Sequence, residues 1–304
     1  MLIVYDIPGQ LGNQLWAFSN IIAVAKDLKV SVYFILSNDY YKLLNEQNLI
    51  RARNENVFIY NENTFKARFI LRLTYFFTAS NKILFRRFLR KLFFIYIIND
   101  KNVDSQLLLK KRNHFCLVDS WKPIEFETAT IRHGEYIRNT FLPNDISKKN
   151  ANDRISSLRE KYDKIIAVHI RRGDYKDFMG GIHYFNDDLY QSKMLQISKL
   201  FEPLNIIFAI FSNECIDVTN FDGLNVEFND TNTSVGDMWA ISKCDLIIGP
   251  LSTFSMWASF WNKVPLKFIR NDSLINSLKD FSYFIAQDLQ KKDLNEMRTK
   301  LVDV

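Results

Sequence analysis

Short apolar runs alternate along the chain with stretches in which apolar residues recur at helical spacing. Near the start, an apolar run at Leu2–Tyr5 leads through a glycine turn into a helical pattern from Asn13 to about Leu28, and Val30–Leu36 is apolar again. A strand, a turn, a helix and a second strand in this order are typical of a parallel βαβ unit. The first part of the chain is therefore predicted to be an α/β domain.

The second half of the chain repeats this alternation. Its predicted strands are Lys164–Ile170, Asn205–Phe211, Leu246–Ile248 and Leu266–Ile269, and its predicted helices are Asp187–Leu200, Gly236–Lys243 and Thr253–Trp261. Between the halves, Leu142–Arg154 is polar and has no apolar period, which favours an interdomain linker or boundary. The sequence thus predicts an α/β protein of two Rossmann-like domains, residues 1–145 and 146–304.

Composition narrows the class of protein without choosing a function. Of 304 residues, 47% are apolar and 24% are charged, which allows a sizeable core and excludes disorder as the main state. The net charge of +6 favours anionic partners such as phosphates, nucleic acid or an acidic membrane surface. Three widely spaced cysteines, Cys116, Cys215 and Cys244, fit neither a disulfide framework nor a zinc site, so we expect a reducing, cytoplasmic compartment.

No membrane anchor is expected from the apolar runs. The first residues lack the pattern of a signal peptide, and the longest later apolar run, Leu92–Ile98, is far shorter than the roughly 20 residues that a membrane span needs.

The region from Phe65 to Ile98 is rich in Phe, Leu, Ile and Tyr, interleaved with Lys and Arg, and no acidic residue lies between Glu62 and Asp100. Two interpretations stay open. A basic amphipathic helix here would lie on an anionic membrane surface, whereas a pair of helices packed on its own domain would have solvated basic edges. We expect no nucleic-acid partner, because nothing else in the chain resembles a nucleic-acid-binding module.

The densest group of chemically useful residues is His169-Ile170-Arg171-Arg172-Gly173-Asp174-Tyr175, at the end of a predicted strand. Ligands of open α/β sheets bind just beyond the carboxyl ends of the strands. The planar forks of Arg171 and Arg172 match phosphate oxygens, so they can bind a diphosphate and stabilise the charge of a leaving group. The alternative is a structural pair of ion-pairing arginines.

Two neighbours of these arginines also have two interpretations each. Asp174 is a candidate general base, or it orients Arg171 or Arg172 through a salt bridge. His169 faces the nucleotide, or it forms a hydrogen bond within the core.

Two further loops join a predicted strand to a predicted helix. Gly9 and Gly12 precede the first helix, whose amides favour negative charge, but this loop lacks the dinucleotide fingerprint and the P-loop lysine. In the run from Gly249 to Ser255, the hydroxyls and amides of Ser252, Thr253 and Ser255 could hold phosphate, or Ser252 or Thr253 could cap the helix.

Asp237 follows Ser234 at the spacing of a helix capping box, which is the structural alternative to a binding role. The chain contains no Asp-x-Asp element and its histidines do not cluster, so no metal cofactor is expected.

Three elements in order, Gln10-Leu11-Gly12-Asn13-Gln14-Leu15, then the segment His169 to Tyr175, then the segment Asp237 to Ser255, resemble the α-1,2-fucosyltransferases of glycosyltransferase family 11, bacterial type. The His-x-Arg-Arg element is also similar to that of the α-1,6-fucosyltransferases. Residues from about Ser37 to Leu142 match no motif.

This resemblance implies a GT-B fold with two Rossmann-like domains facing a central cleft, and GDP-fucose bound mainly by the second domain, with no essential metal or other cofactor. The nucleotide-sugar-binding residues that it implies are His169, Arg171, Arg172, Gly12, Asn13, Asp237, Ser252, Thr253 and Ser255. Among them, Arg171 would contact the β-phosphate, Asp237 the guanine edge, and Gly12 the diphosphate from the first domain.

The expected reaction is an inverting transfer of fucose to a hydroxyl of a glycan acceptor, with Arg171 and Asp174 as catalytic residues. The resemblance implies an α-1,2 linkage, and we expect the acceptor to be a glycan or lipid-linked oligosaccharide of a surface polysaccharide such as O-antigen or capsule. The region from Phe65 to Ile98 could bring the enzyme to the inner face of the cytoplasmic membrane, where such acceptors reside. Gly9-Gln10 replaces a paired glycine, and Leu251 replaces an asparagine of the family pattern. Another GDP-sugar such as a deoxyheptose, and a non-catalytic protein that binds anionic ligands or membrane surfaces, are the alternatives.

Overall fold

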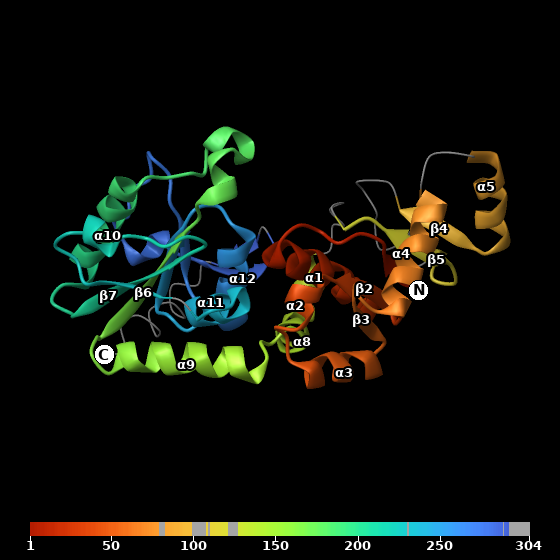
Figure 1. Ribbon diagram of the computed structural model, residues 1–304, viewed down its shortest axis with the longest axis horizontal. Coiled ribbons are helices and arrows are strands. Elements are labelled where there is room, and N and C mark those ends of the chain that lie inside the picture. Colours follow the sequence, from red (N-terminus) through yellow and green to blue (C-terminus); the bar gives the residue numbers. More distant parts are fainter. Residues whose placement is uncertain are drawn as a thin grey trace. The chain divides into compact units, whose positions relative to one another are not determined.

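The computed structural model describes residues 1–78, 83–98, 108, 110–120, 127–229, 231–287 and 289–291. The chain divides into two compact units, Met1–Asn144 (unit 1) and Asp145–Val304 (unit 2). Within the described residues each unit contains a five-stranded sheet, and all neighbouring strands in these two sheets are parallel (Figure 1). The predicted α/β class with two Rossmann-like units is confirmed.

Unit 1 has the strand order β3-β2-β1-β5-β4. The strands are β1 (Leu2–Val4), β2 (Val32–Leu36), β3 (Val57–Asn61), β4 (Ile95–Ile98) and β5 (Phe115–Val118). The helices are α1 (Leu11–Leu28), α2 (Asn38–Tyr41), α3 (Glu46–Asn54), α4 (Phe65–Thr78), α5 (Ile83–Leu92), α7 (Glu127–Arg132) and α8 (Gly134–Thr140). The order in which the strands follow one another reverses between β1 and β5, although these two strands are parallel.

Unit 2 has the strand order β10-β9-β6-β7-β8. The strands are β6 (Lys164–Ile170), β7 (Ile206–Ser212), β8 (Val226–Phe228), β9 (Leu246–Gly249) and β10 (Leu266–Phe268). The helices are α9 (Asp145–Arg159), α10 (Asp187–Phe201), α11 (Ser234–Ile241) and α12 (Thr253–Asn262), and β11 (Tyr283–Ala286) and β12 (Leu289–Lys291) form an antiparallel hairpin. The order of strands reverses between β6 and β9, which makes this boundary the topological switch point of the sheet.

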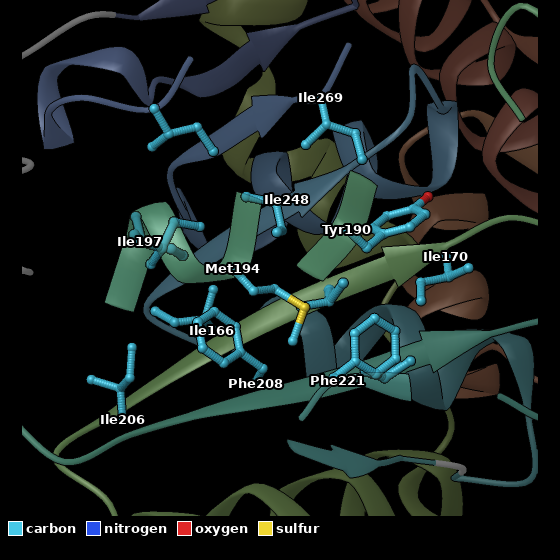
Figure 2. Packing of buried hydrophobic residues seen from close by; sticks show 14 of the residues in the cluster. Ile166, Ile170, Tyr190, Met194, Ile197, Ile206, Phe208, Phe221, Ile248 and Ile269 are labelled. Atoms are coloured by element: carbon cyan, nitrogen blue, oxygen red, sulfur yellow. The ribbon is translucent and has the colours of Figure 1, made fainter. Parts of the chain in front are cut away.

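The central strand of unit 2 is buried on both faces. All residues of β6 are buried, as expected for a strand covered by helices on each side, which explains its almost continuous apolar sequence. On one face Ile166 packs in a cluster with Met194 and Tyr190 of α10 (Figure 2). Because side chains alternate along a strand, His169 points to the opposite face.

The segment predicted to be a linker is instead mostly helix, because α9 spans Asp145–Arg159. Its buried residues Ser147, Ala151, Ile155 and Leu158 recur at helical spacing and form the face that packs inward. The first two of them are small and give only a weak apolar signal, so the prediction of a linker was wrong. The boundary between the two units, after Asn144, does lie within the predicted segment. Trp239 of α11 donates a hydrogen bond from Nε1 to Asn152 Oδ1 of α9 at 3.0 Å, which ties these two helices together.

The basic aromatic region is not one helix. It contains α4, α5 and the strand β4, so the apolar run that begins at Leu92 leads into the sheet, where β4 pairs with β5. Residues 79–82 of the region lie outside the described residues. Within the part of the chain that is described, no helix is both long enough and apolar enough to cross a bilayer.

Candidate nucleotide-sugar site

The predicted site residues of the second half converge where β6 and β9 end side by side. The two strands pair in parallel, with Val168 opposite Ile248, so their carboxyl ends lie at the same edge of the sheet. This edge is the topological switch point, at which open α/β sheets bind their ligands. A Cβ atom on Gly249 would lie 2.8 Å from the carbonyl oxygen of His169, so only glycine allows the two strand ends to approach this closely.

His169 is buried beside the beginning of α12. Its Nδ1 and the hydroxyl of Ser255 share a hydrogen bond at 2.7 Å, and its ring stacks on that of Phe254 with 5.1 Å between centroids. Burial, and then the positive charge of Arg171, lower the pKa of His169 from its ordinary 6.5 to about 3. The imidazole is therefore neutral near pH 7. The hydrogen bond within the core is observed, and contact with a nucleotide stays a prediction.

Arg171 follows β6 directly and keeps its guanidinium near the edge of the sheet. Its Nη2 lies 2.7 Å from Asp174 Oδ1, and the side chains are 17% and 52% exposed. The guanidinium carbon also lies 5.6 Å from the centre of the Tyr175 ring, whose hydroxyl donates a hydrogen bond to the carbonyl oxygen of Leu251 at 3.0 Å. Asp174 thus orients Arg171 through a salt bridge, as one interpretation predicts, while its role as a base stays a prediction.

Arg172 points into the fold. Its guanidinium binds the carbonyl oxygen of Phe185 and the carboxylate of Asp187, and it lies 5.0 Å from the centre of the Tyr184 ring. The residue is only 8% exposed. Arg172 therefore anchors the segment that leads into α10, which is the structural alternative raised above, and a direct contact with diphosphate stays a prediction.

The hydroxyl residues after β9 have different roles: Ser252 caps a helix, whereas Ser255 is buried in the core. Ser252 is the N-cap of α12, and its hydroxyl accepts a hydrogen bond from the backbone N–H of Phe254 at 3.2 Å. Thr253 is the first residue of the helix and is partly exposed. Ser255 is fully buried behind His169, so it acts on the site through the imidazole. The capping interpretation is confirmed, and the first turn of α12 directly follows the end of β9.

Asp237 lies in the first turn of α11, where its Oδ1 accepts hydrogen bonds from the backbone N–H and the hydroxyl of Thr231, both at 2.9 Å. The capping box predicted with Ser234 is wrong. Thr233 is the N-cap and accepts from Gly236 N at 3.1 Å, so the helix begins one residue earlier than that pattern requires. Contact of Asp237 with guanine stays a prediction.

Gly12 and Asn13 belong to the first turn of α1 in unit 1, because this helix begins at Leu11, slightly before the predicted start. Gly12 is buried and Asn13 is partly exposed. The next residue, Gln14, is buried and donates from Nε2 to the carbonyl oxygen of Gly9 at 2.8 Å. Gln14 therefore holds the loop between β1 and α1 in shape, a role that the motif alone does not reveal.

Sequence reasoning missed two residues that shape the arginine loop. Asn213 follows the end of β7 and accepts a hydrogen bond from the backbone N–H of Arg172 at 2.8 Å. Its position after a strand next to β6 could have suggested it. Asp187, the partner of Arg172, gave no signal, because only the fold brings the beginning of α10 to this place. Among the described residues, no group of three or more His, Cys, Asp or Glu side chains could hold a metal ion.

Comparison with known proteins adds the family. Residues 127–277 match the family model described as glycosyl transferase family 11. No curated protein sequence matches the chain. Among solved structures, a mutant of Arabidopsis thaliana FUT1 in complex with GDP gives a TM-score of 0.59 at 10% identity, over 94% of this chain and 74% of that one. POFUT1 in complex with GDP-fucose gives 0.53 at 12% identity, over 88% and 97%, and the fucosyltransferase NodZ from Bradyrhizobium gives 0.49 at 14%, over 90% and 95%.

The likeness to FUT1 and POFUT1 confirms a GT-B-like fold. The range that matches the family contains the end of β6, the end of β9 and the first turns of α11 and α12, which carry every predicted site residue of unit 2. The resemblance stated from the sequence motifs is thereby confirmed at the level of the family. The chain carries a glycosyl transferase family 11 domain and is a glycosyltransferase.

Proposed function

We propose that this protein transfers fucose from GDP-fucose to a hydroxyl of a glycan acceptor. The observation that carries the proposal is Arg171 at the switch point of the sheet in unit 2, with neutral His169 and the first turn of α12 beside it. A guanidinium fork and the amides of a helix N-terminus both complement the oxygens of a diphosphate. The family match and the fold shared with POFUT1, solved with GDP-fucose, support the same donor.

The proposed chemistry is a single displacement with inversion. The acceptor oxygen forms a bond to the anomeric carbon while the bond to the β-phosphate oxygen breaks, and GDP departs with that electron pair. Asp174 takes the proton of the attacking hydroxyl. Arg171 stabilises the charge that develops on the diphosphate, which is the task that a divalent cation has in metal-dependent transferases, so we propose that the reaction is metal-independent.

The other predicted residues take supporting parts in this proposal. Arg172 and Ser255 support the site without contacting the donor. Arg172 anchors the loop after β6, and Ser255 fixes the imidazole of His169. Ser252 and Thr253 present the amides at the beginning of α12. We keep Asp237 as the candidate for the guanine edge, and Gly12 and Asn13 as the candidates in unit 1 for the diphosphate.

Calorimetric titration with GDP, GDP-fucose, GDP-mannose, UDP and ADP, with and without magnesium, tests the donor. We expect metal-independent binding of guanine nucleotides only. Arg171→Ala should weaken GDP binding at least about tenfold, because a hydrogen bond to a charged group contributes roughly 1.5–3 kcal/mol. Arg159→Ala is a matched control, since Arg159 pairs with Asp245 before β9, at the opposite edge of the sheet. Indifference to all five nucleotides would overturn the proposal.

The finer assignments rest on the resemblance and on the surface of unit 1. We propose an α-1,2 linkage in a surface polysaccharide, with a glycan or lipid-linked oligosaccharide as acceptor. Aromatic and basic side chains such as Phe69, Arg72 and Lys91 are exposed on α4 and α5 and support peripheral contact with the inner, anionic face of the cytoplasmic membrane. A transfer assay with GDP-fucose and with a GDP-deoxyheptose distinguishes the two donors. Absence of transfer from either donor would favour the alternative of a non-catalytic protein that binds anionic ligands or membrane surfaces.

A further inference from the structure

A cavity of about 320 Å³ lies between α4 and the sheet of unit 1. Three adjacent strands form its floor, with Ile3 of β1, Leu117 of β5 and Ile95 of β4. Ile3 and Leu117 are direct partners in the ladder, so their side chains project on the same face. A parallel sheet normally has both faces covered by packed helices. Here α4 covers the face without filling the space beneath it.

The roof of the cavity is equally apolar. The inward stripe of α4 contributes Ile70, Thr74 and Phe77. The hydroxyl of Thr74 donates to the carbonyl oxygen of Ile70 at 2.9 Å, so the one polar side chain among the described lining residues turns its hydrogen-bonding capacity back to its own helix. A polar ligand would find no partner here and would lose its hydration. The volume is near the lower end of the range of small-molecule pockets, roughly 300–1,000 Å³. The chemistry of the cavity therefore selects a hydrocarbon chain.

The mouth of the cavity is exposed and apolar as well. Leu73 of α4, Phe93 before β4 and Phe115 of β5 line the cavity and are 44%, 53% and 46% exposed. Phe69 and Phe94 lie next to this lining along the chain and are 57% and 63% exposed. Exposed apolar groups gathered in this way mark an interaction surface.

Charge identifies the kind of surface that meets this mouth. Arg68, Arg72 and Lys91 are exposed on α4 and α5, and Lys110 and Arg112 are exposed before β5. The sequence contains no acidic residue between Glu62 and Asp100. Basic groups around an apolar centre match the phosphates and chains of an anionic bilayer. A second copy of the chain would instead bring like charges together and would present no chain to fill the cavity.

We propose that the cavity between α4 and the sheet of unit 1 holds one acyl chain of an anionic bilayer lipid. The exposed aromatic side chains enter the interface, the basic side chains pair with headgroups, and one chain leaves the bilayer to occupy the space beneath α4. This site goes beyond the proposed transferase function, because it lies in unit 1 and does not depend on the identity of the donor sugar.

Titration of the full chain with cis-parinarate, an anionic fatty acid with a fluorescent chain, measures occupancy directly. We expect saturable binding of one molecule per chain, and displacement by phosphatidylglycerol vesicles at lipid concentrations at least tenfold lower than by phosphatidylcholine vesicles. Leu73→Trp fills the mouth while it keeps the surface apolar, and should weaken parinarate binding at least tenfold. Tyr75→Trp is the matched control, because Tyr75 is 73% exposed on the same helix and does not line the cavity.

Several results would overturn the proposal. These are the absence of saturable binding to the wild-type protein, an equal loss in Leu73→Trp and Tyr75→Trp, binding of free parinarate that neither vesicle displaces, or a dimer that forms with concentration and excludes parinarate. The vesicle competition uses only the wild-type protein, so it decides even if Leu73→Trp fails to fold. Titration of Leu73→Trp with GDP separates the two sites, since we expect its affinity for GDP to be unchanged.

Discussion

His169 shows how burial sets the chemistry of a single side chain. Its pKa in the folded chain is about 3, below the ordinary 6.5, so the unfolded chain binds the proton first as the pH falls. The free energy of unfolding should therefore be unaffected by this group above pH 6.5 and should decrease by up to about 1.4 kcal/mol per pH unit below it. Denaturant titrations between pH 7.5 and 5 measure this slope.

His169→Gln is expected to flatten that pH dependence, because the variant has no group that must stay neutral in the core. His183→Gln is the control, since His183 is partly exposed and lies outside the hydrogen bond with Ser255. The same slope in the wild-type protein and in His169→Gln would show that His169 is not buried in its neutral form.

Gly249 tests the close approach of the two strand ends. The Cβ of alanine would meet the carbonyl oxygen and the Cβ of His169 at 2.8 and 3.0 Å, and backbone atoms cannot yield as the end of a flexible side chain can. Gly249→Ala should lower the free energy of unfolding by about 1–3 kcal/mol, as overpacking does, and should weaken GDP binding by displacing the imidazole. Denaturation and calorimetry on the same preparation measure both effects. A fully stable variant with wild-type affinity would contradict the geometry.

At the scale of elements, the strands buried on both faces were the most predictable part of the chain. The continuous apolar run of β6 carries its own signal, because helices cover both faces and no polar alternation is required. Helix α9 could not be predicted in the same way. Its inward face includes Ser147 and Ala151, whose small side chains are buried yet give little apolar signal in a pattern of apolar and polar positions.

Ala151 allows a direct test of helix α9. Glutamate at this fully buried position would place an uncompensated charge in the interior of unit 2, so Ala151→Glu should cost more than about 3 kcal/mol of unfolding free energy. Asn150→Glu is the matched control, because Asn150 is exposed on the same helix and its replacement should change stability by less than about 0.5 kcal/mol. Equal stability of both variants in urea denaturation would restore the linker interpretation.

The candidate site could be predicted only in part for a similar reason. The position of Arg171 after a strand follows from local sequence, since the strand itself is recognisable. The partners of Arg172 do not, because Asp187 reaches it only once α10 has packed on β6. Local sequence also does not show that β9 pairs with β6. The contact between His169 and Ser255 depends on this pairing, so it is a property of the folded sheet.

At the scale of the whole molecule, each unit has its own parallel sheet with its own switch point, so a ligand of one unit need not order the other. If GDP binds at the edge of β6 and β9, at a concentration about 100 times its Kd it should stabilise unit 2 by about 2.7 kcal/mol. Backbone hydrogen exchange should then slow at the loops that follow these two strands, while the amides of β2 and β3 in unit 1 keep their rates. Arg171→Ala should abolish the protection at the same GDP concentration, which ties it to the arginine rather than to nucleotide bound elsewhere. Equal protection of β2 and β3 would contradict a donor site carried mainly by unit 2 and would require that Gly12 and Asn13 bind GDP as strongly as the second unit does.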